Sequence, residues 1–379
     1  MGTQVFVRSE TVEAMPPPVR DRGLVGWARE HLFSGPLNTI LTLLSVLFLW
    51  WLIPPLLNFL IVDAVWTGED RTACIVTPER PRVGACWAFV IERFNFFVYG
   101  FYPIAERWRV DAFFALLLFG IFWLLTPSVP GKRLAVVYFF IVLPVVSVML
   151  LIGFAPLGLA YVPTSLWGGI LVTVVVASVG MVFSLPLGIV LALGRRSTMP
   201  AVRLFSVIFI EFVRGVPLIT VLFMASVMLP LFVPDTWSPD KLLRALIGVA
   251  LFAAAYMAEV VRAGLQAIPR GQYEGAQALG LSYWRMMGLI ILPQALRITI
   301  PNIVNSNIAL FKDTTLVFIV GIFDFLRTIE AARIDPQWAT PVTSTTGYAF
   351  AAIFYFLCCW AMSAYAKSVE RRLATGYRR

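Results

Sequence analysis

The chain has 379 residues, of which 59% are hydrophobic and only 13% are charged, and its mean hydropathy is +0.83. This composition excludes an ordinary soluble domain, a disordered chain and a disulfide-rich scaffold, and it indicates a membrane protein. The 30 Lys and Arg against 21 Asp and Glu give a net charge of +9. In a membrane protein such an excess reflects basic residues on the cytoplasmic side, so no nucleic-acid partner is expected.

Apolar runs long enough to cross a bilayer recur along the chain. They predict an all-α polytopic membrane protein with about eight transmembrane helices. The first run follows a polar arm, residues 1–36, and is too long for a signal-peptide core, so we expect it to stay in the protein as a signal anchor. The expected spans are Leu37–Val62, Ala112–Leu125, Leu134–Ala155, Trp167–Leu193, Leu204–Val233, Leu242–Ala267, Ile298–Phe325 and Tyr348–Ala366.

The distribution of basic residues predicts the orientation. If the N-terminus is cytoplasmic, most Lys and Arg fall in inside segments. Most of those that fall outside lie in one long loop, residues 63–111, where the rule is weak. Both termini should therefore be cytoplasmic, with a cytoplasmic arm at 1–36 and N-terminal helices over 37–160. The aromatic segment Trp87–Tyr102 is a possible ninth span, but it would place Arg195 and Arg196 outside. We interpret it as an amphipathic segment at the outer interface, with an ordinary packed loop as the alternative.

The four cysteines form two pairs in this topology. Cys74 and Cys86 share the outer loop, where an oxidising periplasm would let them form a disulfide. Cys358 and Cys359 lie in the last span and are expected to be packing residues. His31 is the single histidine, so neither a metal site nor a catalytic triad is expected.

The long inside loop between Arg262 and Arg297 is the most informative segment. Gln272–Leu279 can form a short helix, Gly280 suits its C-terminal cap, and Ser282 can cap a second helix that runs to Pro293. The result is a helix-turn-helix across the membrane surface. One side of the first helix should carry only short side chains, so that another protein could approach its backbone closely. The small residues are Gly275, Ala276 and Ala278.

The same loop carries a resemblance to the EAA loop of ABC-importer permeases. The matching residues, at the right separations, are Glu274, Gly275, Ala276, Gly280, Ile290, Leu292 and Pro293. That family usually has Ala at the second position. Gly275 keeps the surface low but weakens the helix by about 1 kcal/mol relative to Ala. The alternative is an ordinary amphipathic loop with chance matches.

The segments that flank the loop extend the resemblance. Phe212–Leu218, Tyr256–Gly264 and Leu310–Leu316 are similar to the polar-amino-acid branch of these permeases. The resemblance covers Trp167 to the C-terminus and implies the five-helix core of a type I ABC importer over residues 161–379, with the EAA loop at 262–297. Three extra N-terminal helices, with Gly84–Phe89 in the outer loop, resemble more narrowly the larger permease subunit of general L-amino-acid importers of Gram-negative bacteria.

The resemblance implies a transport subunit of the bacterial inner membrane that is not an enzyme. The sequence has no phosphate-binding P-loop, since Gly131-Lys132 is followed by Arg133 rather than Ser or Thr. This chain should hold no cofactor, and ATP with Mg²⁺ should bind a partner ATPase dimer whose cleft receives the EAA loop. The other implied partners are a second permease subunit, a periplasmic amino-acid-binding protein, the lipid bilayer and the L-amino acid substrate.

Ionisable residues inside the predicted spans should pair or face a polar cavity, because each is costly in lipid. Glu211 with Arg214, and Glu259 with Arg262, are spaced i,i+3 as ion pairs on one helix require. These pairs could simply tie helices together. A polar run on one span could instead hold the carboxylate and ammonium of an amino acid. With Arg214 and Glu259, the candidate substrate-path residues are Asn305, Ser306, Lys312, Asp313, Thr314 and Thr315.

Two other classes of function are open at this stage. An ion-coupled secondary transporter could use the same buried charges, but its halves should show an internal repeat, which the sequence does not display. A membrane scaffold that transports nothing would not need polar residues in the middle of a span.

Overall fold

The structure is a computed structural model that describes residues 23–78, 80–234 and 239–374. Within these ranges the chain forms helices and no strand, as the all-α prediction requires. Residues 1–22 of the predicted arm lie outside the described residues. The chain divides into two compact units, one made of the chain up to Ala64 with Val76–Ala85, the other of Val65–Ile75 with Cys86 onward.

The first unit is built on one long apolar helix. It contains α1 (Gly23–His31) and α2 (Pro36–Leu57), which a π-helical segment, η2 (Asn58–Val62), prolongs. None of the side chains in α2 or η2 is buried. A helix that is apolar on all sides and unpacked needs an apolar solvent, which a bilayer supplies. Pro36 lies in its first turn, where a missing N–H costs nothing.

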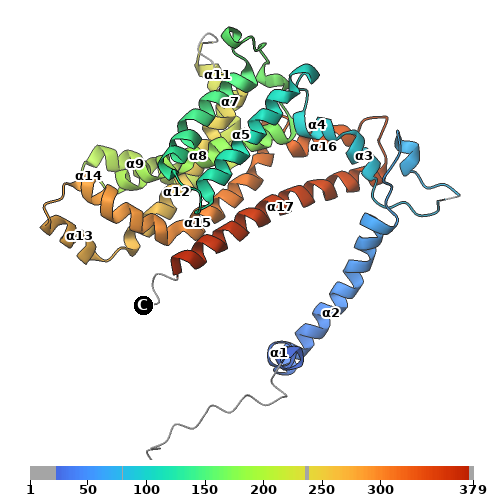
Figure 1. Cartoon of the computed structure of the whole chain (residues 1–379), viewed down its shortest axis with the longest axis horizontal. Coiled ribbons are helices and arrows are strands. Elements are labelled where there is room, and N and C mark those ends of the chain that lie inside the picture. Colours follow the sequence, from blue (N-terminus) through green and yellow to red (C-terminus); the bar gives the residue numbers. More distant parts are fainter. Residues whose placement is uncertain (1–22, 79, 235–238, 375–379) are drawn as a thin grey trace, which may run out of the picture. The chain divides into compact units, whose positions relative to one another are not determined.

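The second unit holds the remaining helices, and α8 (Gly169–Arg195) and α12 (Lys241–Ala267) cross at its centre (Figure 1). Small residues permit this close crossing, since a Cβ on Gly188 would lie 2.8 Å from the Met257 Cβ. Around this pair lie α5 (Arg107–Leu125), α6 (Lys132–Val137), η5 (Tyr138–Val142), α7 (Leu143–Ile152), α9 (Pro200–Gly215), α10 (Leu218–Phe223), η8 (Met224–Met228), α11 (Leu229–Phe232), α13 (Arg270–Ala278), α14 (Tyr283–Met286), η10 (Met287–Ile291), α15 (Leu292–Asp313), η11 (Thr314–Val320), α16 (Phe325–Arg333) and α17 (Pro341–Ala374).

The expectation of about eight transmembrane helices is confirmed. Among the described residues, seven helical segments are long and apolar enough to cross a bilayer, and a bent pair makes up to eight. The bent pair replaces the expected continuous span Leu204–Val233 and turns by 107° between α9 and α10–α11. Pro217 causes the break, because proline disfavours the helical conformation in the residue before it, and Val216 is extended at φ −112°.

The segment Trp87–Tyr102 packs on neighbouring helices with one of its sides. It forms α3 (Trp87–Glu92) and α4 (Phe94–Tyr99), which contact α8, α16 and α17. Phe89 and Phe97 are completely buried. The packed alternative therefore holds for these two residues, because aromatic side chains that suit a membrane interface also suit a protein core.

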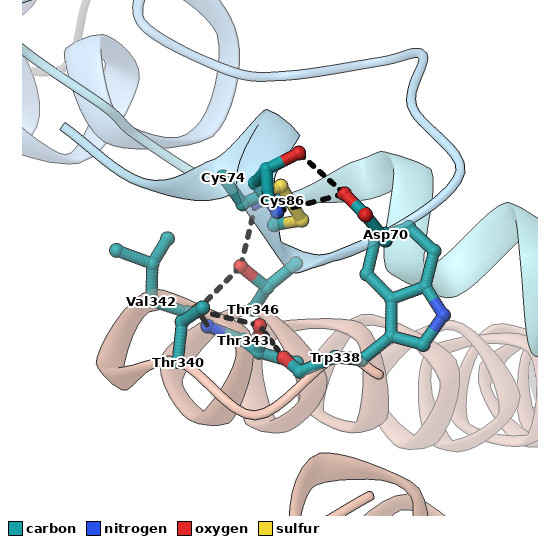
Figure 2. Close-up of a disulfide and its surroundings, with 9 residues drawn as sticks. Asp70, Cys74, Cys86, Trp338, Thr340, Val342, Thr343 and Thr346 are labelled. Atoms are coloured by element: carbon teal, nitrogen blue, oxygen red, sulfur yellow. Dashed lines mark hydrogen bonds between the residues drawn. A yellow bond between two sulfur atoms is a disulfide. The ribbon is translucent and has the colours of Figure 1, made fainter. Parts of the chain in front are cut away.

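Cys74 and Cys86 are joined in the structure by the expected disulfide, with their Cα atoms 5.8 Å apart. Both residues are buried. Figure 2 shows that the Cys86 backbone N–H donates to the Thr346 hydroxyl of α17, over 2.8 Å, while that hydroxyl donates to the Val342 carbonyl. The backbone hydrogen bond of Cys86 thus fastens the disulfide-bonded segment to the first turns of α17. We call this side of the unit the disulfide end and the side that carries α13 the loop end.

Removing this bridge should cost stability. The double change Cys74→Ala and Cys86→Ala is expected to lower the free energy of unfolding by about 2–3 kcal/mol, because the reduced chain regains the entropy of a short ring. Thermal unfolding in detergent measures the loss, and Cys358→Ala with Cys359→Ala is the matched control. Labelling of all four cysteines in unreduced, denatured protein would contradict the bridge.

Candidate functional site

The turn at the loop end is formed by Gly280, as predicted. This residue has φ +70°, the left-handed conformation that glycine adopts without strain. Its N–H donates to the Gln277 carbonyl over 2.9 Å, and the N–H of Leu281 donates to the Ala276 carbonyl over 3.2 Å. These two bonds define a Schellman motif that ends α13. The first helix begins two residues earlier than the predicted Gln272.

The faces of α13 differ from the expectation in one respect. Gly275 and Ala278 are exposed, but Ala276 is 2% exposed and packs in the core beside Met286 and Ile291. Neighbouring residues point about 100° apart on a helix, so the three small residues cannot share one side. The approachable surface is therefore formed by Gly275 and Ala278 with the exposed Glu274 and Leu279.

The second helix of the loop continues into the next span. Ser282 is its N-cap residue, although its side chain makes no capping hydrogen bond. The expectation that this helix stops at Pro293 is wrong, because α14, η10 and α15 run on without a break to Asp313. Pro293 lies in the first turn of α15, directly after the π-helical residues. Such a π-helical insertion lets a helix pass a residue that cannot donate a backbone hydrogen bond.

Side-chain hydrogen bonds fasten α13 to the transmembrane helices. The Tyr273 hydroxyl donates to the Leu265 carbonyl of α12, and Arg196, the C-cap residue of α8, donates to the same hydroxyl. Gln294 of α15 donates to the Gln272 side chain. Ile290 and Leu292 are half-buried against the same core cluster. These bonds link α13 to α12, to α15 and to the residue that ends α8.

A charge cluster joins three helices near the loop end, with Glu259 of α12 at its centre. Its carboxylate lies 2.8 Å from Arg262, 2.9 Å from Arg195 of α8 and 3.7 Å from Arg214 of α9. Arg195 also contacts Glu211 at 2.8 Å. We call these five residues the charge cluster. Three guanidinium groups against two carboxylates leave it with net positive charge.

Of the two predicted ion pairs, the structure forms one. The pair Glu259 and Arg262 is present. The pair Glu211 and Arg214 is not, because Glu211 pairs with Arg195 and Arg214 turns to Glu259. Sequence reasoning missed Arg195 because its partners lie on other helices. Its position at the cytoplasmic end of a predicted span was the available signal.

A cavity of about 220 Å³ lies between α8, α12 and α15; its surface is mostly apolar, but five polar side chains line it, and we call it the polar cavity. Ser306, Asn307 and Asp313 line it from one face of α15, and Tyr256 and Ser184 line it from α12 and α8. The Arg214 guanidinium lies 5.7 Å from the centre of the Tyr256 ring, so the charge cluster adjoins the cavity wall. The Tyr256 and Ser184 side chains were not predicted as path residues.

The other predicted path residues do not line this cavity. Asn305 and Lys312 are exposed on a different face of α15. Thr314 and Thr315 donate their hydroxyls to backbone carbonyls one turn earlier, over 2.7 and 2.9 Å. The structure brings Ser306 and Asp313 together and separates both from Lys312. Adjacent side chains on a helix diverge by about 100°.

The sequence matches a family model described as the inner membrane component of binding-protein-dependent transport systems, over residues 184–375. It is 50% identical to the inner membrane amino-acid ABC transporter permease protein YhdY of Escherichia coli K12, over 92% of this chain and 93% of that one. It is 41% identical to the glutamate/glutamine/aspartate/asparagine transport system permease protein BztC of Rhodobacter capsulatus, over the full length of both. A crystal structure of an amino acid ABC transporter with histidines aligns over 54% of this chain and 92% of its own, at 26% identity and a TM-score of 0.47.

Proposed function

This chain belongs to the family of inner membrane components of binding-protein-dependent transport systems, and we propose that it forms the translocation path of an ATP-driven importer for L-amino acids. The family membership supports an ABC importer over an ion-coupled secondary transporter. The observation that carries the coupling part of the proposal is the exposed face of α13, held by a Schellman turn and fastened to three spans.

The exposed face of α13 is the proposed contact with the ATPase. This face offers a partner one charge and a backbone covered by few side-chain atoms. Its exposed residues are Glu274, Gly275, Ala278 and Leu279. ATP and Mg²⁺ would bind the partner ATPase dimer, not this chain. Closure of that dimer would move α13. The bonds that link α13 to the ends of α8, α12 and α15 would then tilt these helices, so that the passage opens in turn to the two sides of the membrane.

The orientation that fits this coupling places the loop end in the cytoplasm. The disulfide then lies in the periplasm, where disulfides persist. Arg195, Arg196, Arg270 and Arg285 lie at the loop end, in agreement with the positive-inside rule. Both termini would be cytoplasmic, and the disulfide end would receive a periplasmic amino-acid-binding protein. A second permease subunit would complete the path.

The polar cavity is the proposed passage for the amino acid. Its volume of about 220 Å³ is below the range of about 300–1,000 Å³ typical of drug-sized ligands, which fits one amino acid. Asp313 would bind the ammonium group of the substrate. The carboxylate would be drawn to the net positive charge cluster, through Arg214 beside the Tyr256 ring.

Neutralising the cavity carboxylate tests this passage. Asp313→Asn is expected to lower amino-acid-stimulated ATPase activity by about tenfold or more, because a hydrogen bond to a charged group contributes about 1.5–3 kcal/mol. Lys312→Met, on the exposed face of α15, should have a smaller effect. Asn307→Ala and Asn305→Ala form a matched pair on the same helix, and only the first should impair transport.

The measurement uses the assembled transporter in vesicles, normalised to folded complex. Co-purification of an ATPase with the tagged chain is expected, and its absence would contradict the importer proposal itself. If the ATPase is present but Lys312→Met impairs transport more than Asp313→Asn, the passage lies elsewhere while the importer proposal stands.

A further inference from the structure

A second cavity, of about 350 Å³, lies between the N-terminal helices and the core. Its walls come from α5, from η5 and α7, from α8 and from α12. As far as the described residues go, it shares no lining residue with the polar cavity, and its α12 residues, Leu242, Leu243 and Leu246, lie at least six positions before those that line the polar cavity. It is therefore separate from the proposed passage and from the coupling loop.

The cavity is almost entirely apolar and opens within the membrane-spanning region. Val148 of α7, Phe183 of α8 and Leu243 of α12 line it and are 57%, 49% and 48% exposed, so they form its rim. An apolar cavity even of about 150 Å³ stays dry and takes up apolar ligands. Water is therefore a poor occupant, and the medium outside the rim is the hydrocarbon of the bilayer.

One end of the cavity carries polar groups. Trp167 lines it and is 6% exposed, and its indole Nε1–H has no acceptor among the described residues. A buried donor without a partner is costly, so the site favours a ligand that brings an acceptor. Asp240 also lines this end and is exposed, and its carboxylate accepts a hydrogen bond from Thr164 over 2.7 Å.

These groups occur in the order of the parts of a phospholipid. Thr164 and Trp167 lie in the short segment before α8, and Asp240 is the N-cap of α12, so the polar end lies where two spans begin. The apolar cleft matches an acyl chain, and the Trp167 donor next to it matches an ester carbonyl. The exposed carboxylate of Asp240 matches an ammonium-bearing headgroup. A lipid ester carbonyl is free to accept from Trp167, whereas a helix of a partner protein has its backbone carbonyls bonded within the helix and would need a side-chain acceptor at this position.

We propose that this cavity binds one acyl chain of a zwitterionic, ammonium-bearing phospholipid of the surrounding bilayer, with the lipid ester accepting from Trp167 and its ammonium beside Asp240. The lipid would fill the space between the N-terminal helices and the core and bind them to each other. The carboxylate of Asp240 would disfavour anionic phospholipids that carry no ammonium group.

Photo-crosslinking in the assembled transporter tests the chain position. Nanodiscs would contain phosphatidylethanolamine with a diazirine in one acyl chain, and labelled residues would be mapped by mass spectrometry. Ser147 and Ser178, which face the cavity from α7 and α8, should be labelled several-fold more than Val190 on the exposed face of α8. Equal labelling at Ser178 and Val190 would overturn the proposal.

Filling the cavity should displace the lipid. Ser178→Trp is expected to abolish labelling at Ser147 and to remove one retained phospholipid per chain in native mass spectrometry, whereas Val190→Trp should change neither. If Ser178→Trp does not fold, Ser147→Phe fills the cavity from the opposite wall. Unchanged lipid retention in a folded filled variant, or no labelling at Ser147 and Ser178 in the assembled transporter, would contradict lipid as the occupant.

The polar end has its own test. Asp240→Asn keeps an N-cap side chain on α12 but removes the charge. It should reduce several-fold the preference for phosphatidylethanolamine over phosphatidylglycerol among retained lipids. Trp167→Phe should lower retention of both lipids. An unchanged headgroup preference in Asp240→Asn would show that the carboxylate does not select the lipid.

Discussion

Alanine at Glu259 is expected to lower the free energy of unfolding of this protein by about 3 kcal/mol. Removal of one partner from a buried ion pair costs about 3–5 kcal/mol, because the remaining charge is left uncompensated. Glu259 is 16% exposed and holds Arg195, Arg214 and Arg262, which are each about a third exposed or less. Their partial exposure places the loss at the lower end of the range. Thermal unfolding of the solubilised protein measures it.

The matched control is the second carboxylate of the charge cluster. Glu211 is 54% exposed and contacts Arg195, which keeps its bond to Glu259 when Glu211 is removed. Glu211→Ala should therefore cost less than about 1 kcal/mol. Added salt should diminish the effect of Glu211→Ala and leave that of Glu259→Ala nearly unchanged. Equal losses in the two variants would show that Glu259 is not the centre of the cluster.

The features that sequence reasoning predicted depend on neighbours in the chain. The glycine at the turn, the ion pair between Glu259 and Arg262 and the bridge between Cys74 and Cys86 each follow from spacings of at most 12 residues. The spans follow from the length and hydropathy of single segments. Such signals are present before any tertiary contact forms.

The features that it missed depend on contacts between helices. Arg195 contacts carboxylates on α9 and α12, and Tyr256 lines a cavity with residues of α15. The spacing of residues along the chain does not predict contacts of this kind. The burial of Ala276 depends on the direction in which α13 lies on the core. The helix continues through Pro293 by means of a π-helical insertion, and the hydrophobic periodicity of the sequence does not reveal such an insertion.

Valine at Gly280 is expected to abolish transport while the folded protein stays in the membrane. A β-branched residue at φ +70° costs about 1–3 kcal/mol, which lowers the population of the native turn by about 5- to 150-fold. A Cβ on Gly280 would meet no described atom within 4 Å, so the effect comes from the backbone rather than from a clash. The altered turn would change the direction of α13 and its proposed fit to the ATPase. Uptake by vesicles that contain the assembled transporter measures the loss.

Two variants separate backbone strain from added bulk. Gly288 lies in the π-helical segment of the same loop, with no atom within 4 Å of an added Cβ and no positive φ, so Gly288→Val adds the same side chain without the strain. It should transport amino acids at a much higher rate than Gly280→Val. Gly280→Asn should retain partial activity, because asparagine tolerates the left-handed conformation better than valine. A Gly280→Val protein with unimpaired uptake would mean that the Schellman turn has no part in coupling, whatever the exposed face of α13 contacts.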